Sequence, residues 1–177
     1  FMVGGIVRDS RMNRPVHDID LSFCGNVRDF AKRVADDLGA SFFMLHVKFQ
    51  TARIIYRSQS GKKRWIDIVA TRENSILEDL EFRDFTVNAI AIDLQDRIKI
   101  IDPLNGAMDL HKKLLQMCKP DSIENDPVRI LRAIRLAVQF NWKISSTTIN
   151  AMKSSAPKLM DVSAERKRDE LYRIFDL

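Results

Sequence analysis

The sequence has little or nothing of several features that define whole classes of protein. Its 177 residues include only two cysteines, Cys24 and Cys118, and two thiols alone build neither a disulfide framework nor a zinc site. Half-buried thiols of this kind are typical of a reducing compartment, so we expect a cytoplasmic protein. No apolar run approaches the length that crosses a bilayer, and no signal-peptide pattern opens the chain. We therefore expect no membrane partner.

The residues that are plentiful indicate a folded protein. Hydrophobic residues make up 45% and charged residues 30% of the chain, which is enough to bury a core and excludes a disordered tail. Lys and Arg number 29 against 24 Asp and Glu, a net charge of +5. This excess favours a polyanionic partner, although many proteins without one share it. Residues 1–3 already read as a strand and the last helical pattern reaches the final residue, so we expect a piece of a longer protein.

Hydrophobic periodicity predicts an α+β head, residues 1–119, and an all-helical neck, residues 120–177. In the head, the spacing of apolar residues from Val27 to Leu38 predicts an amphipathic helix that Asn26 caps. A short helix is expected over 75–81, and strands are expected over 17–23, 42–49, 52–56, 65–69, 89–93 and 97–101. In the neck, Asp126-Pro127 resembles an N-cap followed by proline at the first helical position, and helices are expected over 145–152 and 164–175.

Carboxylates alternate with apolar residues at two places in the head. Asp18 and Asp20 lie two apart in a predicted strand, so both side chains leave one face while Ile19 and Leu21 point to the core. Asp67 repeats the pattern between two isoleucines, and it completes a three-carboxylate cluster if the two strands are neighbours. Mg²⁺ takes oxygen ligands and often uses one or two carboxylates with substrate phosphates. Exposed strand carboxylates without a ligand remain the commoner alternative.

Paired glycines precede these carboxylates. Gly4-Gly5 ahead of a short helix offers backbone N–H groups to an anion, and Arg8 follows one turn later. An ordinary tight turn would explain the glycines alone. Glycines followed by a strand with two carboxylates give a phosphate cradle and metal ligands in the order that nucleotidyl transfer needs. Further along, Arg129, Arg132 and Arg135 recur every three residues, which indicates a solvated helix face or, less often, an RNA-phosphate track.

These segments carry a family resemblance that spans the chain. The sequence resembles the class II CCA-adding enzymes and bacterial poly(A) polymerases, members of the DNA polymerase beta nucleotidyltransferase superfamily. Phe82 replaces the first arginine of the family's Arg-Arg-Asp-Phe-Thr motif, and Asn125 stands where the family usually has Glu. The segments that carry the resemblance are Gly4–Asp9 with Asp18–Asp20, Glu81–Ala89, Asp102–Leu110, Asn125–Arg135 and Glu165–Leu171.

The resemblance implies a small mixed sheet, a helical neck and a two-metal reaction. Asp18 and Asp20 would hold Mg²⁺, and Asp67 would be the third catalytic acid. It also implies nucleotide contacts, in which Asp126 and Arg129 read the base of ATP or CTP; the other contacts fall on Gly4, Gly5, Arg8, Arg83, Asp84, Asn88 and Arg132. The RNA substrate would most often be a tRNA 3′ end.

Three alternatives remain open at this point. A poly(A) polymerase would extend RNA less selectively. A catalytically silent RNA-binding module would bind in a salt-dependent manner that is indifferent to Mg²⁺ and nucleotide. A small-molecule nucleotidyltransferase of the same superfamily would have no use for the arginine-bearing helix. Enzymes that add CCA, CC, A or poly(A) share these motifs, so the motifs leave the choice among these activities open. They also leave the oligomeric state open.

Overall fold

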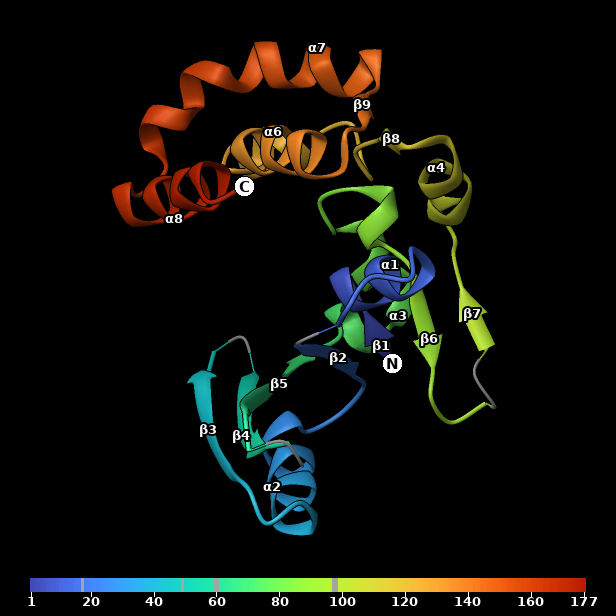
Figure 1. Cartoon of the computed structure of the whole chain (residues 1–177), viewed down its shortest axis with the longest axis vertical. Helices are drawn as coiled ribbons and strands as arrows, with labels where there is room; N and C mark the ends of the chain where they lie inside the picture. Colours follow the sequence, from blue (N-terminus) through green and yellow to red (C-terminus); the bar gives the residue numbers. More distant parts are fainter. Residues whose placement is uncertain (17, 49, 59–60, 97–98) are drawn as a thin grey trace. The chain divides into compact units, whose positions relative to one another are not determined.

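The computed structural model describes residues 1–16, 18–48, 50–58, 61–96 and 99–177, which form two compact units (Figure 1). The first unit is Phe1–Leu80 with Ile90–Ile101, and the second is Glu81–Ala89 with Asp102–Leu177. Packing thus groups residues 81–89 and 102–119 with the helical part of the chain, which the boundary expected near residue 120 did not anticipate. Separately folding domains 1–119 and 120–177 stay a prediction.

A mixed sheet organises the first unit, as the sequence predicts. Within the described residues its seven strands run in the order β3-β4-β5-β2-β1-β6-β7. β2 and β5 are parallel, and every other neighbouring pair is antiparallel. The strands are β1 Met2–Val3, β2 Ile19–Phe23, β3 Ser41–His46, β4 Thr51–Arg57, β5 Lys63–Ala70, β6 Ala91–Asp93 and β7 Lys99–Ile101. The predicted strands are therefore confirmed with shifted ends, and expectations for residues 17, 49, 97 and 98 lie outside the described residues.

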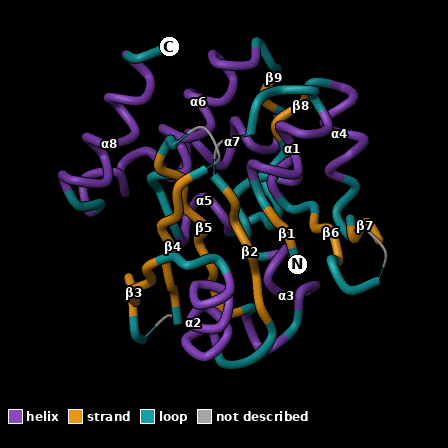
Figure 2. Tube along the Cα trace, turned by 60° about the horizontal axis from the view of Figure 1, so that its bottom comes forward, coloured by secondary structure: helices purple, strands orange, loops and turns teal. Residues whose placement is uncertain are grey.

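Helix α2, Val27–Asp37, covers one face of this sheet (Figure 2). Its start is the predicted one, since the Asn26 side chain accepts a hydrogen bond from the Asp29 amide at 3.1 Å. Its apolar stripe packs against Ile54, Ile66 and Ile68 in a core cluster that Ile19 and Leu21 also join. The other helices of this unit are α1 Gly5–Arg11, the 3₁₀ turn η1 Arg72–Asn74 and α3 Ile76–Glu81, whose last residue packs with the second unit.

The second unit is mainly helical. Its elements are η2 Thr86–Asn88, α4 Gly106–Lys112, β8 Leu114–Leu115, α5 Ser122–Asn125, α6 Arg129–Phe140, β9 Lys143–Ile144, α7 Ser146–Ser155, η3 Ala156–Asp161 and α8 Ala164–Phe175. The expected helices over 145–152 and 164–175 are confirmed as α7 and α8. The expectation of an all-helical neck is wrong at β9, because Asn141 ends α6 in a left-handed conformation with φ 53° and the chain then pairs with β8 in parallel. None of the helices in the described ranges is long and apolar enough to cross a membrane.

Candidate active site

The carboxylates predicted from the sequence lie on neighbouring strands of the sheet. Asp20 on β2 is the direct partner of Asp67 on β5 in the parallel register, and Asp18 immediately precedes β2. Asp18 and Asp20 are exposed, whereas Ile19 and Leu21 pack in the core cluster on the opposite face. The adjacency that the sequence left open is therefore confirmed, and three carboxylates belong to one face of the sheet.

An arginine that the sequence analysis missed joins these carboxylates. Arg53 on β4 is the register partner of Asp67 and binds it through two bonds, Nε to Oδ1 at 2.7 Å and Nη2 to Oδ2 at 2.6 Å. The hydrogen bond to Asp67 raises the pKa of Arg53; burial opposes this rise, and the charges of Asp67, Asp18 and Asp20 add to it. The signal was available, because Arg53 lies between apolar residues just as Asp67 does.

Two carboxylates, not the three that the sequence suggested, are the candidate ligands for a hard divalent cation. Within the described part of the chain, no three His, Cys, Asp or Glu side chains are gathered so that they could hold a metal ion, so the predicted three-carboxylate cluster is not formed. The physical reason is that Arg53 binds both carboxylate oxygens of Asp67. Asp18 and Asp20 are both exposed and carry oxygen donors, and one or two carboxylates with substrate phosphates are a sufficient Mg²⁺ ligand set.

The paired glycines form the turn between β1 and α1. Gly4 has φ 78° and ψ −141°, a conformation that residues with a Cβ rarely adopt. Arg8 is buried beside them, because a Cβ added at Gly5 would lie 3.4 Å from its Nη2. The Arg8 guanidinium binds the Asp9 carboxylate at 2.9 and 3.0 Å. The structure therefore places Arg8 next to the glycines, as expected, with part of its guanidinium engaged by Asp9.

In the second unit, the buried carboxylate of Asp84 binds several neighbouring groups. Its carboxylate is buried and accepts hydrogen bonds from the Phe85 amide at 2.8 Å and from Asn88 Nδ2 at 3.1 and 3.2 Å, and Arg132 Nε lies 2.6 Å from Oδ2. Burial by itself raises the pKa of Asp84, but Arg132, Asn88, the Phe85 amide and Arg129 together hold this pKa below its ordinary value. The carboxylate is thus kept ionised and fixes the direction of Arg132.

This arrangement predicts a pH-dependent stability difference between the wild type and the Asp84→Asn variant. A carboxyl whose pKa is lower in the folded state stabilises the fold above its unfolded pKa, here 3.8, and loses that contribution as pH falls through the folded pKa. We expect Asp84→Asn to unfold more easily at pH 7, with the difference narrowing only below about pH 4. Urea unfolding of both proteins between pH 7 and pH 3 measures this difference, and a difference that widens on acidification would contradict the assignment.

Arg129 at the start of α6 is held by the backbone of the segment before it. Nη1 donates to the Arg83 carbonyl at 2.9 Å and to the Ser122 hydroxyl, and Nη2 donates to the Phe82 carbonyl at 2.9 Å. A guanidinium has five N–H donors. The Nε and the second Nη2 hydrogen are therefore left on one edge, where Asp126 Oδ2 lies 3.7 Å from Nε.

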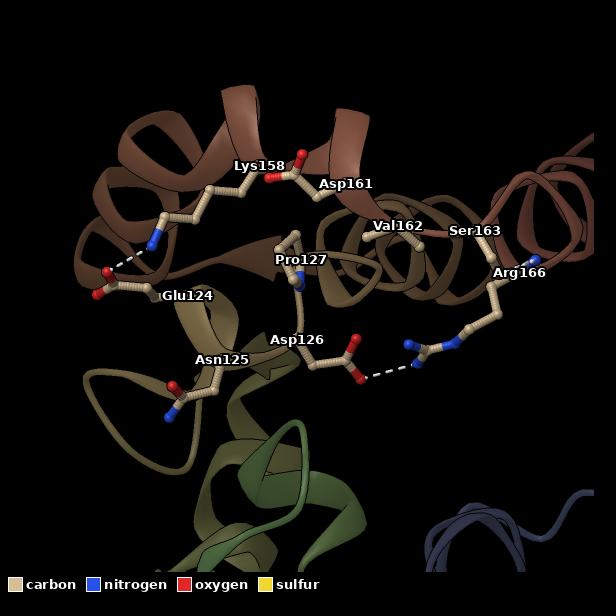
Figure 3. A pocket seen from close by; sticks show the side chains of 9 residues that line it. All are labelled: Glu124, Asn125, Asp126, Pro127, Lys158, Asp161, Val162, Ser163 and Arg166. Carbon is tan, nitrogen blue, oxygen red and sulfur yellow. Dashed lines mark hydrogen bonds and ion pairs between the residues drawn. The ribbon is translucent and has the colours of Figure 1, made fainter.

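Asp126 does not cap the helix that follows it. α6 begins at Arg129 with Val128 at its N-cap and no side-chain capping bond, so the sequence-based prediction of an Asp126 cap is wrong. The helix has its N-cap two residues later, at Val128, whose φ of −60° and ψ of −21° are helical. Its carboxylate instead binds Arg166 Nη2 at 2.9 Å. Both side chains line a pocket of about 410 Å³ within this unit (Figure 3).

Comparisons with known proteins identify the family. Residues 1–116 match the model of the poly(A) polymerase head domain. The chain belongs to this family. Residues 141–177 match a second model, described as a probable RNA- and SrmB-binding site of polymerase A. The resemblance to class II nucleotidyltransferases is thereby confirmed.

Relatives of the poly(A) polymerase head-domain family align along nearly the whole chain. A CC-adding tRNA nucleotidyltransferase of Geobacter sulfurreducens is 36% identical over 100% of this chain, and an A-adding tRNA nucleotidyltransferase of Aquifex aeolicus is 35% identical over 88% of it. The structure of a Thermotoga maritima CCA-adding enzyme complexed with tRNA aligns with 98% of the chain at a TM-score of 0.88 and 35% identity. The chain spans 40%, 20% and 42% of the lengths of these three proteins, respectively.

One departure from the family pattern and one row of arginines have structural explanations. Asn125, where the family usually has Glu, donates from Nδ2 to Asp121 Oδ2 at 2.9 Å, a bond that a carboxylate at this position would not make. Arg129, Arg132 and Arg135 do not form a simple solvated face, because each binds protein groups, and the phosphate-track alternative stays a prediction. Arg135 Nε binds Glu170 at 2.7 Å with both side chains largely buried, and the other two arginines are held as described above.

Proposed function

We propose that the full-length protein is a template-independent nucleotidyltransferase that adds CMP, AMP or both to the 3′ end of tRNA and releases pyrophosphate. The observation that carries the proposal is the pairing of Asp20 with Asp67 across β2 and β5, next to Asp18. The tRNA nucleotidyltransferases that align with this chain support the choice of substrate. We place the reaction in the cytoplasm, which the two free thiols suit.

Each functional residue has a role in this proposal. Asp18 and Asp20 would hold Mg²⁺, which when bound supplies charge neutralisation at the α-phosphate and at the leaving pyrophosphate. The RNA 3′-oxygen forms a bond to the α-phosphorus, the bond from that phosphorus to the bridging oxygen breaks, and pyrophosphate leaves. Asp67 takes the hydroxyl proton, because each of its oxygens keeps a lone pair beyond its bond to Arg53.

The residues of the second unit are proposed to select the nucleotide. Asp126 offers an acceptor and Arg129 offers its Nε and Nη2 donors, so together they can imitate the edge of a pairing base. The carbonyls of Phe82 and Arg83 fix the Arg129 guanidinium before a nucleotide binds. Asp84, which accepts hydrogen bonds from Asn88, fixes Arg132. The remaining candidates for phosphate contacts are Gly4, Gly5, Arg8 and Arg83.

A tRNA extension experiment tests this proposal. The full-length protein is incubated with Mg²⁺ and with tRNAs that end before the first C, after CC or at mature length, and CTP and ATP are given separately. Addition that stops at CC, at A or at CCA supports the proposal and identifies the nucleotides that the enzyme adds. A protein that extends mature RNA with ATP without stopping is a poly(A) polymerase, the second candidate, which the description of the head-domain family favours. Salt-dependent RNA binding with no incorporation indicates a silent RNA-binding module and contradicts the proposal.

A further inference from the structure

Among the described residues of the first unit, exposed side chains of β3, β4 and β5 lie on the face of the sheet that carries the carboxylates. On the opposite face, Ala52, Ile54 and Ile68 are completely buried beneath α2. On the face that carries the carboxylates, Phe43 on β3 and Trp65 on β5 keep 44% and 37% of their surface exposed. Exposed apolar patches rimmed by polar residues commonly mark a binding surface. This surface, defined by Phe43, Arg53, Arg57, Lys63 and Trp65, is called the outer platform below.

The outer platform presents its groups in a fixed order leading away from the carboxylates. The antiparallel register of β4 and β5 pairs Arg53 with Asp67 and Arg57 with Lys63, and Trp65 lies between these two pairs on β5. Alternate strand residues share a face and lie about 7 Å apart. Starting from the catalytic acids, the face therefore offers a carboxylate, then an indole ring, then two exposed cations.

Contacts on the platform fix the indole next to the acids. The Arg53 guanidinium lies 5.7 Å from the centre of the Trp65 ring while it binds Asp67 through two bonds. The same arginine therefore holds the inner side of the ring and the carboxylate together. At the outer end, Arg57 Nη1 donates to the Gly61 carbonyl at 3.1 Å, which holds this cation at the edge of the platform.

This order of groups matches the chemistry of single-stranded nucleic acid. Proteins bind single strands with aromatic rings on which bases stack and with cations that follow the backbone phosphates. A protein partner would leave the Arg57–Lys63 pair without opposing charge unless it were acidic, and an acidic partner would be repelled by Asp18 and Asp20. An RNA strand fits both ends of the platform. Its phosphates would lie at Arg57 and Lys63, and its 3′ end would lie at the carboxylates that are proposed to bind a metal ion.

We propose that the outer platform holds the unpaired 3′-terminal nucleotides of the RNA that is extended, with a base stacked on Trp65 and the preceding phosphates at Arg57 and Lys63. This inference rests on the proposed function and names a subsite of that same site.

The test uses the full-length protein and a tRNA that carries 2-aminopurine as its penultimate nucleotide, a base whose fluorescence falls when it stacks. We expect binding to quench the wild-type signal. Trp65→Ser is expected to restore it and to raise the KM for RNA about tenfold, as loss of one stacked base does, with the KM for nucleotide unchanged. Trp65→Phe keeps an aromatic ring and is expected to stay close to the wild type, so it separates loss of stacking from loss of folding. Leu38→Ser is the matched control, since it removes an exposed apolar side chain at the end of α2, beside the covered face.

A second pair of variants tests the cations. Replacing Arg57 and Lys63 together by Ser is expected to reduce the slope of log K against log salt by about 1.4, because each single-strand phosphate contact contributes about 0.7. Replacing Lys32 and Arg33 on α2 removes the same charge from the other side of the sheet and is expected to leave the slope unchanged.

The outcomes separate this inference from the proposed function. Quenching that persists in Trp65→Ser, or a raised KM for nucleotide in place of RNA, overturns the inference even if the enzyme is active. Trp65-dependent quenching in a protein that incorporates no nucleotide upholds the platform and overturns the proposed function.

Discussion

Replacing Asp18 or Asp20 by alanine in the full-length protein is expected to abolish nucleotide incorporation and to leave the fold intact. Both side chains are exposed, so their loss removes no core contact. Together they are the oxygen donors proposed for Mg²⁺, and losing charge stabilisation worth several kcal/mol slows a reaction by at least about a thousandfold. Incorporation of labelled CMP or AMP with Mg²⁺ present measures the effect, and titration with Mn²⁺ measures cation binding directly.

Asp36→Ala is the matched control for these variants. Asp36 is also an exposed aspartate of the first unit, but it lies on α2, which packs on the covered face of the sheet. It should therefore keep full incorporation and full Mn²⁺ binding. Normal incorporation by either Asp18→Ala or Asp20→Ala would show that the two-metal assignment is wrong.

Arg129→Lys is expected to raise the KM for nucleotide by ten- to a hundredfold and to erase the preference between CTP and ATP. Lysine keeps the charge but loses the planar fork, so it cannot bind the Phe82 and Arg83 carbonyls and face a base at the same time. Each hydrogen bond to a charged group contributes about 1.5–3 kcal/mol, which corresponds to this range of KM. Steady-state kinetics with CTP and ATP on the same tRNA measure both quantities.

Arg135→Lys provides the control in the same helix. Arg135 binds Glu170 away from the Arg129 contacts, so this variant is expected to lose some stability and to keep nucleotide selectivity. If Arg129→Lys keeps the wild-type preference between CTP and ATP, residues other than Arg129 recognise the base.

The local features of the sheet were predictable because alternation is a property of the sequence itself. Ile19 and Leu21 flank Asp20 along the chain, and they pack in the core while the aspartate is exposed. The pairing of Asp20 with Asp67 was not predictable, since strand order depends on contacts between residues far apart in the sequence. The alternation around Arg53 was visible in the sequence, but its bond to Asp67 was not, because that bond depends on β4 lying beside β5.

The second unit shows where local patterns fail. Asp126-Pro127 has the composition of a helix start, but the helix begins at Arg129. The Asp126 carboxylate instead binds Arg166, which lies forty residues further along the chain. Arg132 and Arg135 have the spacing of a solvated face, yet Asp84 and Glu170 bind them from distant segments. In each case a long-range ion pair decides the position of a side chain whose local pattern suggested a simpler role.

Gathering Asp18, Asp20 and Asp67 on one face has an energetic consequence for the free protein. Like charges on adjacent strands repel, and the Arg53 guanidinium, which binds both carboxylate oxygens of Asp67, opposes that repulsion. The hydrogen-bonded backbones of β2 and β5 keep Asp20 and Asp67 next to each other, so the cost of bringing these two charges together is met during folding. Under the proposed function, Asp18 and Asp20 would hold a divalent ion on a strand whose pairing with β5 is complete before nucleotide binds, so the sheet would need no rearrangement between rounds of addition.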